Sequence, residues 1–229
     1  MIKIFLSVCL YAVCLYGCSQ HDVKQKVIFN PKESSTYRIR LNSKLVQLDV
    51  EVACSYKNQQ DSIYVTSVIK KLSYKDGSDL EKDINKEYER YIDEALLTVY
   101  NIHGRVLENT NALNIVNTDL LVAELPEYEI KQDDTWESKR SAKPDLLFDS
   151  ILTKYTCKKI NAEETRLIVE MNYKENNKSK PDYLRLNKKY EGYYILNTAT
   201  GAIRDAKFEI TGFDGFSNIN GYVDIEKIK

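Results

Sequence analysis

The chain has 229 residues and a formal net charge of −1, and its 29% of charged residues mix both signs. No basic patch of the kind that binds nucleic acid is present, so no nucleic-acid partner is expected. Tyrosine is enriched, with 17 residues against 6 phenylalanines and 1 tryptophan. This composition suits half-buried strands, in which the ring packs and the hydroxyl reaches water.

A short apolar segment opens the chain. Residues 4–16 follow Lys3 and have the length of the hydrophobic region of a signal peptide. They are too few to span a bilayer, which takes about 20 apolar residues. The alternatives are a buried core segment, or a plain secretory signal that is cut before Cys18.

The apolar segment ends in Leu15-Tyr16-Gly17-Cys18, which resembles the lipobox of bacterial lipoproteins. The resemblance implies that residues 1–17 are a lipoprotein signal peptide and that Cys18 is acylated, with palmitate among its chains. Because acyl chains supply the membrane affinity, the membrane is the expected partner of Cys18. Ser19 stands where Asp would retain a lipoprotein in the inner membrane, which favours the outer membrane. No acidic run follows, which favours its periplasmic face.

The next elements predict one long hairpin. Residues 18–30 are expected to be a polar tether, and residues 31–229 are expected to be a single β-rich domain. Period-two alternation predicts a strand over 37–41. Near-strict alternation over 46–57 predicts a long strand with one wet face, and 63–74 is predicted to return as its partner.

One helix is predicted after the hairpin, over residues 80–95, where apolar residues recur at helical spacing. Residues 96–101 and 105–110 flank His103-Gly104 as a predicted hairpin. Residues 111–125 are ambiguous, with a short helix as one interpretation.

The C-terminal half is predicted to return to strands. An acidic turn is expected at 132–135 and a polar link over 138–144. Further strands are predicted over 150–160, 165–173, 190–196, 202–211 and 221–228. The fold class is therefore α+β and mostly antiparallel β, a curved sheet or half-open barrel around one main helix. In element order this plan is similar to the LolA-like fold, by analogy alone.

Two stretches resemble uncharacterised envelope lipoprotein families of Bacteroidetes. Residues 125–136 run from leucine-proline through an acidic turn to threonine-tryptophan, and residues 192–203 run from glycine-tyrosine into a threonine-glycine hairpin. The families have no assigned activity, so the resemblance implies a location and no chemistry.

Two cysteines lie in the expected domain, Cys54 and Cys157. Both fall on the apolar parity of their strands and in an oxidising compartment, so they could form a disulfide. Two separate buried thiols fit the sequence equally well.

The chemistry-bearing residues do not predict an active site. His21 lies in the expected tether and His103 at a turn, so a histidine triad or metal cluster is not supported, and no cofactor is expected. The acidic pairs Asp133-Asp134 and Glu163-Glu164 are interpreted as solvated turns, since a glycan hydrolase would need carboxylates from different strands.

Two triplets, Asp61-Ser62-Ile63 and Asp149-Ser150-Ile151, resemble the O-glycosylation acceptor of Bacteroidetes. The alternative interpretation is that Ser62 and Ser150 are turn residues entering strands.

The sequence therefore predicts a non-enzymatic, membrane-anchored envelope lipoprotein that binds an apolar ligand or an envelope protein partner. The alternatives are an envelope glycan-acting hydrolase and a structural component of an outer-membrane assembly.

Overall fold

The structure is a computed structural model that describes residues 23–44, 46–109, 118–141, 150–175, 187–213 and 218–229. Within these residues the chain forms eleven strands, one α-helix, α2 (Glu81–Glu89), and one 3₁₀-helix, η1 (Thr118–Leu121). The strands are β1 (Ser35–Ser43), β2 (Gln47–Gln59), β3 (Ser62–Lys75), β4 (Ala95–Asn101), β5 (Val106–Asn109), β6 (Thr135–Ser141), β7 (Ser150–Ile160), β8 (Glu164–Lys174), β9 (Asn187–Asn197), β10 (Ile203–Phe213) and β11 (Asn218–Lys227).

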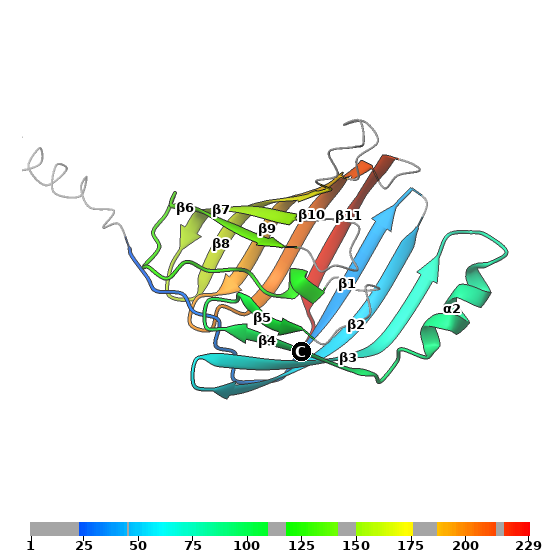
Figure 1. Cartoon of the computed structure of the whole chain (residues 1–229), viewed down its shortest axis with the longest axis horizontal. Helices are drawn as coiled ribbons and strands as arrows, with labels where there is room; N and C mark the ends of the chain where they lie inside the picture. Colours follow the sequence, from blue (N-terminus) through cyan, green and yellow to red (C-terminus); the bar gives the residue numbers. More distant parts are fainter. Residues whose placement is uncertain (1–22, 45, 110–117, 142–149, 176–186, 214–217) are drawn as a thin grey trace, which may run out of the picture.

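All eleven strands form one antiparallel sheet in the order β5-β4-β3-β2-β1-β11-β10-β9-β8-β7-β6. The sheet curves strongly but does not close, because β5 and β6 are its two free edges (Figure 1). The expected antiparallel, curved sheet is thus confirmed. The α+β class fits only in part, because the described residues are mostly strand and hold a single short α-helix.

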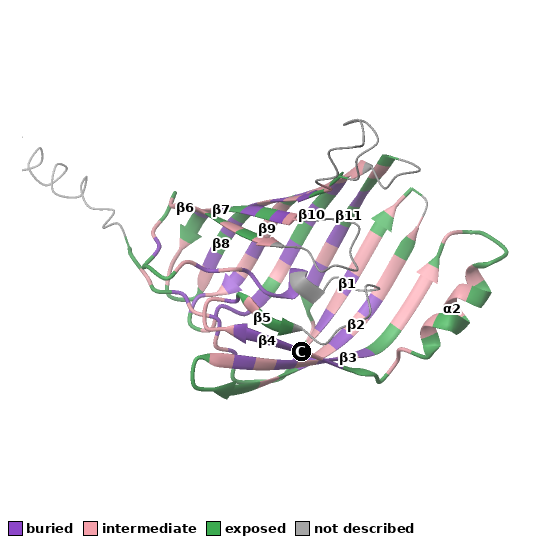
Figure 2. Cartoon of the chain, viewed as in Figure 1, coloured by how far each residue is buried: buried purple, intermediate pink, exposed green. Residues whose placement is uncertain are grey.

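Alternation along the strands decides which face is buried. In β2, Val50, Val52 and Cys54 are buried, whereas their neighbours face water on the convex side. Across the register Tyr37 pairs with Val52, so the apolar positions of adjacent strands lie on the same face. The concave face of the sheet is therefore the hydrophobic core, and Figure 2 shows the buried stripes running across it.

β1 and β11, the first and last strands along the chain, are neighbours at the centre of the sheet. β1 and β11 pair from Tyr37 with Lys227 to Ser43 with Gly221. Here the lower end of the sheet is the one where β1 begins, and the upper end is the one where β1 stops (Figure 1).

Two irregular segments cover the lower part of the concave face. We call residues 25–31 the N-terminal strap and residues 120–131 the inner strap. Gln25 and Ile130 exchange two backbone hydrogen bonds of 2.9 Å, which join the straps to each other. Val27 and Phe29 are buried, and the Phe29 N–H donates to the carbonyl of Ile102 at 2.7 Å.

The N-terminal strap corrects the predicted tether. Residues 25–30 belong to the folded core, so the prediction of a tether over 18–30 is wrong for this part. Gly201 shows how closely the strap packs: a Cβ atom there would lie 2.5 Å from the carbonyl oxygen of Ile28, and the φ of Gly201 is +62°. A glycine is therefore required beneath the strap.

The helix is shorter than predicted. It ends at Glu89 rather than 95, because the following residues turn back toward the sheet, where Asp93 donates to the carbonyl of Ile69 at 2.9 Å. Asn85 fixes the helix to β3, since its side-chain amide bonds both the N–H and the carbonyl of Tyr74 at 2.8 Å.

The cysteines also need a correction. Cys54 on β2 and Cys157 on β7 are buried free thiols, with five strands of the sheet between theirs. The disulfide interpretation is therefore wrong and that of two separate buried thiols is right. Burial raises the pKa of each thiol to about 11.

Candidate apolar binding face and the seam cluster

The upper part of the concave face keeps apolar side chains that the straps do not fully bury. Leu41, Leu48 and Leu72 continue the buried rows of β1, β2 and β3, but each is only partly buried. In the register Leu41 pairs with Leu48, and Leu48 pairs with Tyr74. Leu72 pairs with buried Val50, so it lies one row lower and diagonal to Leu48. We call this group the upper concave face.

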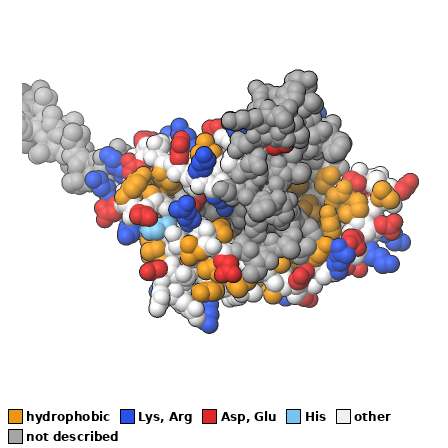
Figure 3. Space-filling model, viewed as in Figure 1, with side chains coloured by type: hydrophobic (Ala, Val, Ile, Leu, Met, Phe, Trp, Pro, Cys, Tyr) orange, Lys and Arg blue, Asp and Glu red, His pale blue; other side chains and the backbone are white. Residues whose placement is uncertain are grey.

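Helix α2 borders the upper concave face without sealing it. None of its residues is buried, and the Tyr88 ring meets Tyr74 edge to face at 6.0 Å between centroids. Leu80, just before the helix, is 63% exposed. Figure 3 shows hydrophobic side chains gathered between the undescribed residues and the charged surface at the α2 side of the molecule. Partly exposed apolar side chains in a concave setting are the usual lining of a binding site for an apolar ligand.

The lower part of the concave face is filled. The inner strap contributes buried Leu120, Ala123 and Leu125 to the core. Between the inner strap and the strands lies an enclosed cavity of about 10 Å³, bordered by Glu124 and Tyr155 among others. This space suits one water molecule and nothing larger, so it cannot hold a chain-like ligand.

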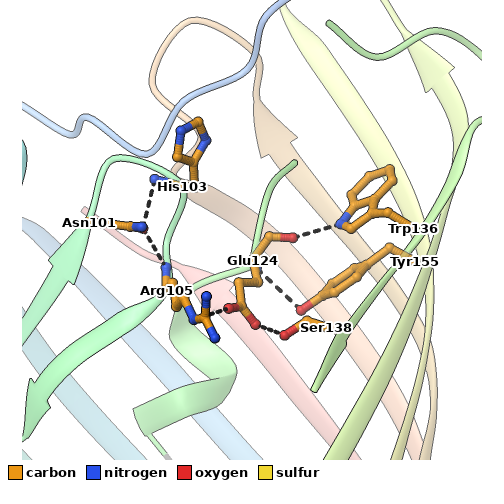
Figure 4. Close-up of polar contacts among 7 residues, drawn as sticks. All are labelled: Asn101, His103, Arg105, Glu124, Trp136, Ser138 and Tyr155. Atoms are coloured by element: carbon orange, nitrogen blue, oxygen red, sulfur yellow. Dashed lines mark hydrogen bonds and ion pairs between the residues drawn. The ribbon is translucent and has the colours of Figure 1, made fainter. Parts of the chain in front are cut away.

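A polar cluster fastens the inner strap across the open side of the sheet. We call Arg105, Glu124, Trp136, Ser138 and Tyr155 the seam cluster (Figure 4). Arg105 precedes β5, whereas Ser138 lies on β6, so their contacts with Glu124 link the two free edges. The Glu124 carboxylate lies 3.7 Å from Arg105 Nε and accepts a hydrogen bond from the Ser138 hydroxyl.

The backbone of Glu124 is held as firmly as its side chain. The Trp136 indole donates to the Glu124 carbonyl at 2.9 Å, and the Glu124 N–H donates to the Tyr155 hydroxyl at 3.2 Å. The rings of Trp136 and Tyr155 stack with centroids 5.3 Å apart. Burial raises the pKa of Tyr155, so its phenol stays protonated. On the opposite side, the His103 carbonyl accepts the Leu125 N–H at 2.7 Å.

These contacts favour a structural role for the seam cluster. The partners of Glu124 are a guanidinium, a hydroxyl, an indole and a phenol, and together they hold the inner strap in place (Figure 4).

The acidic pairs form turns, as predicted. Asp133 has a φ of +66° and pairs with Lys158 at 3.2 Å, while Asp134 accepts the Lys131 N–H at 3.0 Å. In the other turn, the Asn161 side chain accepts the N–H groups of both Glu163 and Glu164.

The remaining predicted site residues are placed as follows. Cys18 lies outside the described residues. Ser62 and Ser150 are the first residues of β3 and β7, as predicted, and their glycosylation stays a prediction. Among the described residues, no cluster of three or more His, Cys, Asp or Glu side chains could hold a metal ion. In the same part of the chain, the structure has no helix with the length and apolarity that crossing a membrane requires.

Sequence reasoning missed the upper concave face and Glu124 as features of a site. The three leucines read as ordinary core positions, because alternation does not tell which part of a strand is covered. No model of a known protein family matches the chain, and no curated protein matches it either.

Proposed function

We propose that this protein is an envelope lipoprotein that binds an apolar, chain-like ligand such as the acyl chain of a lipid on its upper concave face. It would be held through acylated Cys18 at the periplasmic face of the outer membrane. The lipobox-like run supports the anchor. The half-open barrel beside a helix, LolA-like by analogy, supports a carrier.

One observation carries the binding proposal. Leu41 pairs with Leu48, and Leu72 lies diagonal to Leu48 on β3; this aliphatic strip stays partly exposed at the end of an otherwise buried face. An aliphatic strip fits a flexible acyl chain, because burial of each methylene group contributes about 0.8 kcal/mol. Tyr74 pairs with Leu48 and so borders the strip, and the polar end of a tyrosine suits the polar end of an amphiphile.

The proposal is tested by titrating the protein with a fluorescent fatty acid, dansyl-undecanoic acid. The Cys18→Ala background keeps the protein's own acyl chains out of the measurement. Leu48→Gln should weaken binding about tenfold or more, since a buried leucine contributes about 1.5–3 kcal/mol.

Ile168→Gln is the matched control. Ile168 lies on the convex face of β8 and is 40% exposed, so this change should leave the affinity unaltered. Equal losses in the two variants, or no binding by the parent protein, would contradict the proposal. Circular dichroism and the unfolding midpoint of each variant establish that it is folded.

A further inference from the structure

We infer that the lower end of the sheet faces the membrane, so that the upper concave face and α2 point away from it. The inference rests on the proposed acylation of Cys18. It adds an orientation and a second membrane contact, which the anchor alone does not specify.

The length and attachment of the chain before the domain limit the orientation. The first described residue is Val23, two positions before Gln25, which is fixed to Ile130 by two hydrogen bonds. Val23 is five positions after Cys18, and a fully extended chain spans at most about 3.6 Å per position, or about 18 Å in all. Val23 therefore stays close to the bilayer that holds the acyl chains.

The rest of the sheet extends well beyond this reach. β3 has 14 residues, which at about 3.3 Å per residue gives a strand of about 46 Å. In Figure 1 the N-terminal strap enters at the left of the molecule and α2 lies at the far right. With the strap held at the membrane, α2 comes near the bilayer only if the whole sheet lies flat on it.

Exposed apolar side chains at the strap favour an upright arrangement. Val23 and Tyr128 are 48% and 51% exposed, and each lies two residues from the paired Gln25 and Ile130. Tyrosine is enriched at membrane interfaces, where its ring enters the apolar region and its hydroxyl stays with the headgroups. The exposed charges near Tyr128 are of both signs: Glu127 and Glu129 are acidic, and Lys24 is basic. The contact is thus made by the apolar side chains and adds to the anchor.

This orientation has a consequence for the proposed ligand. With its lower end on the membrane, the protein presents the upper concave face beside α2 to the aqueous compartment. A ligand would then be exchanged with a partner across that compartment, rather than drawn from the bilayer that holds the anchor.

The orientation is tested with a fluorescent label, NBD, at single exposed cysteines in the acylated protein. Tyr128→Cys places the label at the lower end, Leu80→Cys at α2, and Tyr222→Cys on the convex face. Cys54 and Cys157 are buried with their pKa raised to about 11, so they react slowly with the label. The labelled proteins are reconstituted into phosphatidylethanolamine–phosphatidylglycerol vesicles that contain a doxyl-lipid quencher.

The label at 128 should be quenched and shifted to the blue, whereas the labels at 80 and 222 should be unaffected. Quenching at 80 or 222 equal to that at 128 overturns the orientation while leaving the anchor intact. A protein without acyl chains by mass spectrometry that does not float with the vesicles overturns the anchor, and the inference with it. The Cys18→Ala protein labelled at 128 is the control and should show no quenching.

Discussion

Phe29 tests whether the N-terminal strap belongs to the fold. Its side chain is 1% exposed and meets Tyr56 and Tyr100 edge to face, with centroids 6.2 and 5.6 Å away. Phe29→Ala removes a fully buried ring and both aromatic contacts, which typically costs about 3–5 kcal/mol. The loss is large against the about 5–15 kcal/mol that stabilises a typical domain.

The free energy of unfolding is measured by urea titration of the Cys18→Ala protein, followed by the fluorescence of its single tryptophan, Trp136. A lower midpoint with an unchanged slope would show lost stability rather than a changed unfolded state. Tyr128→Ala, at the same end but 51% exposed, should change stability by less than about 0.5 kcal/mol. A loss below about 1 kcal/mol for Phe29→Ala would refute the packing described here and restore residues 25–30 to a tether.

Three further changes test other parts of the structure by the same titration. Gly104 and Gly77 both have positive φ, but only at Gly104 would a Cβ atom meet a backbone oxygen of the inner strap, at 2.3 Å. Gly77→Ala should therefore lower the free energy of unfolding by about 1 kcal/mol, and Gly104→Ala should lower it clearly more. Glu124→Ala should lower the free energy of unfolding by about 1–3 kcal/mol, because it leaves the Ser138 hydroxyl and the Arg105 guanidinium without their carboxylate. Glu124→Gln should lower it less, because the amide oxygen can still accept from the hydroxyl. Equal losses in the two variants would exclude this explanation. The raised pKa values of Cys54 and Cys157 predict that the protein loses stability at alkaline pH. Below pH 9 the folded and unfolded states both keep the thiol proton, whereas between pH 9 and 11 only the unfolded state releases it. Each thiol should therefore lower the free energy of unfolding by about 2–3 kcal/mol over this range. Stability that stays constant to pH 11 in the parent protein, or falls equally in a Cys54→Ala, Cys157→Ala double variant, would contradict this assignment.

The long hairpin shows what alternation can establish. Residues 46–57 and 63–74 were predicted as paired strands, and the structure has β2 over Gln47–Gln59 and β3 over Ser62–Lys75. Because one face is buried, an uninterrupted period of two fixes both the strand and its orientation. The same reasoning placed β7 to β11 within a few residues of their bounds.

Features that depend on distant contacts could not be predicted. Most of β6 falls in the predicted polar link over 138–144, because its sequence has no apolar row. In the structure Trp136, Ser138 and Arg140 are the positions of β6 that face inward. The N-terminal strap has only Val27 and Phe29 as apolar anchors, and nothing local shows that they reach Ile102 and Tyr100. Which part of the concave face is covered likewise depends on the path of the straps, so the upper concave face emerged only from the structure.

Photo-crosslinking with a diazirine-bearing fatty acid, mapped by mass spectrometry, tests the central claim most directly. The claim predicts that the crosslinks fall on Leu41, Leu48 and Leu72 and that unlabelled fatty acid competes for them. Crosslinks confined to the convex face, around Ile168 and Tyr222, or none that competitor removes, would contradict it.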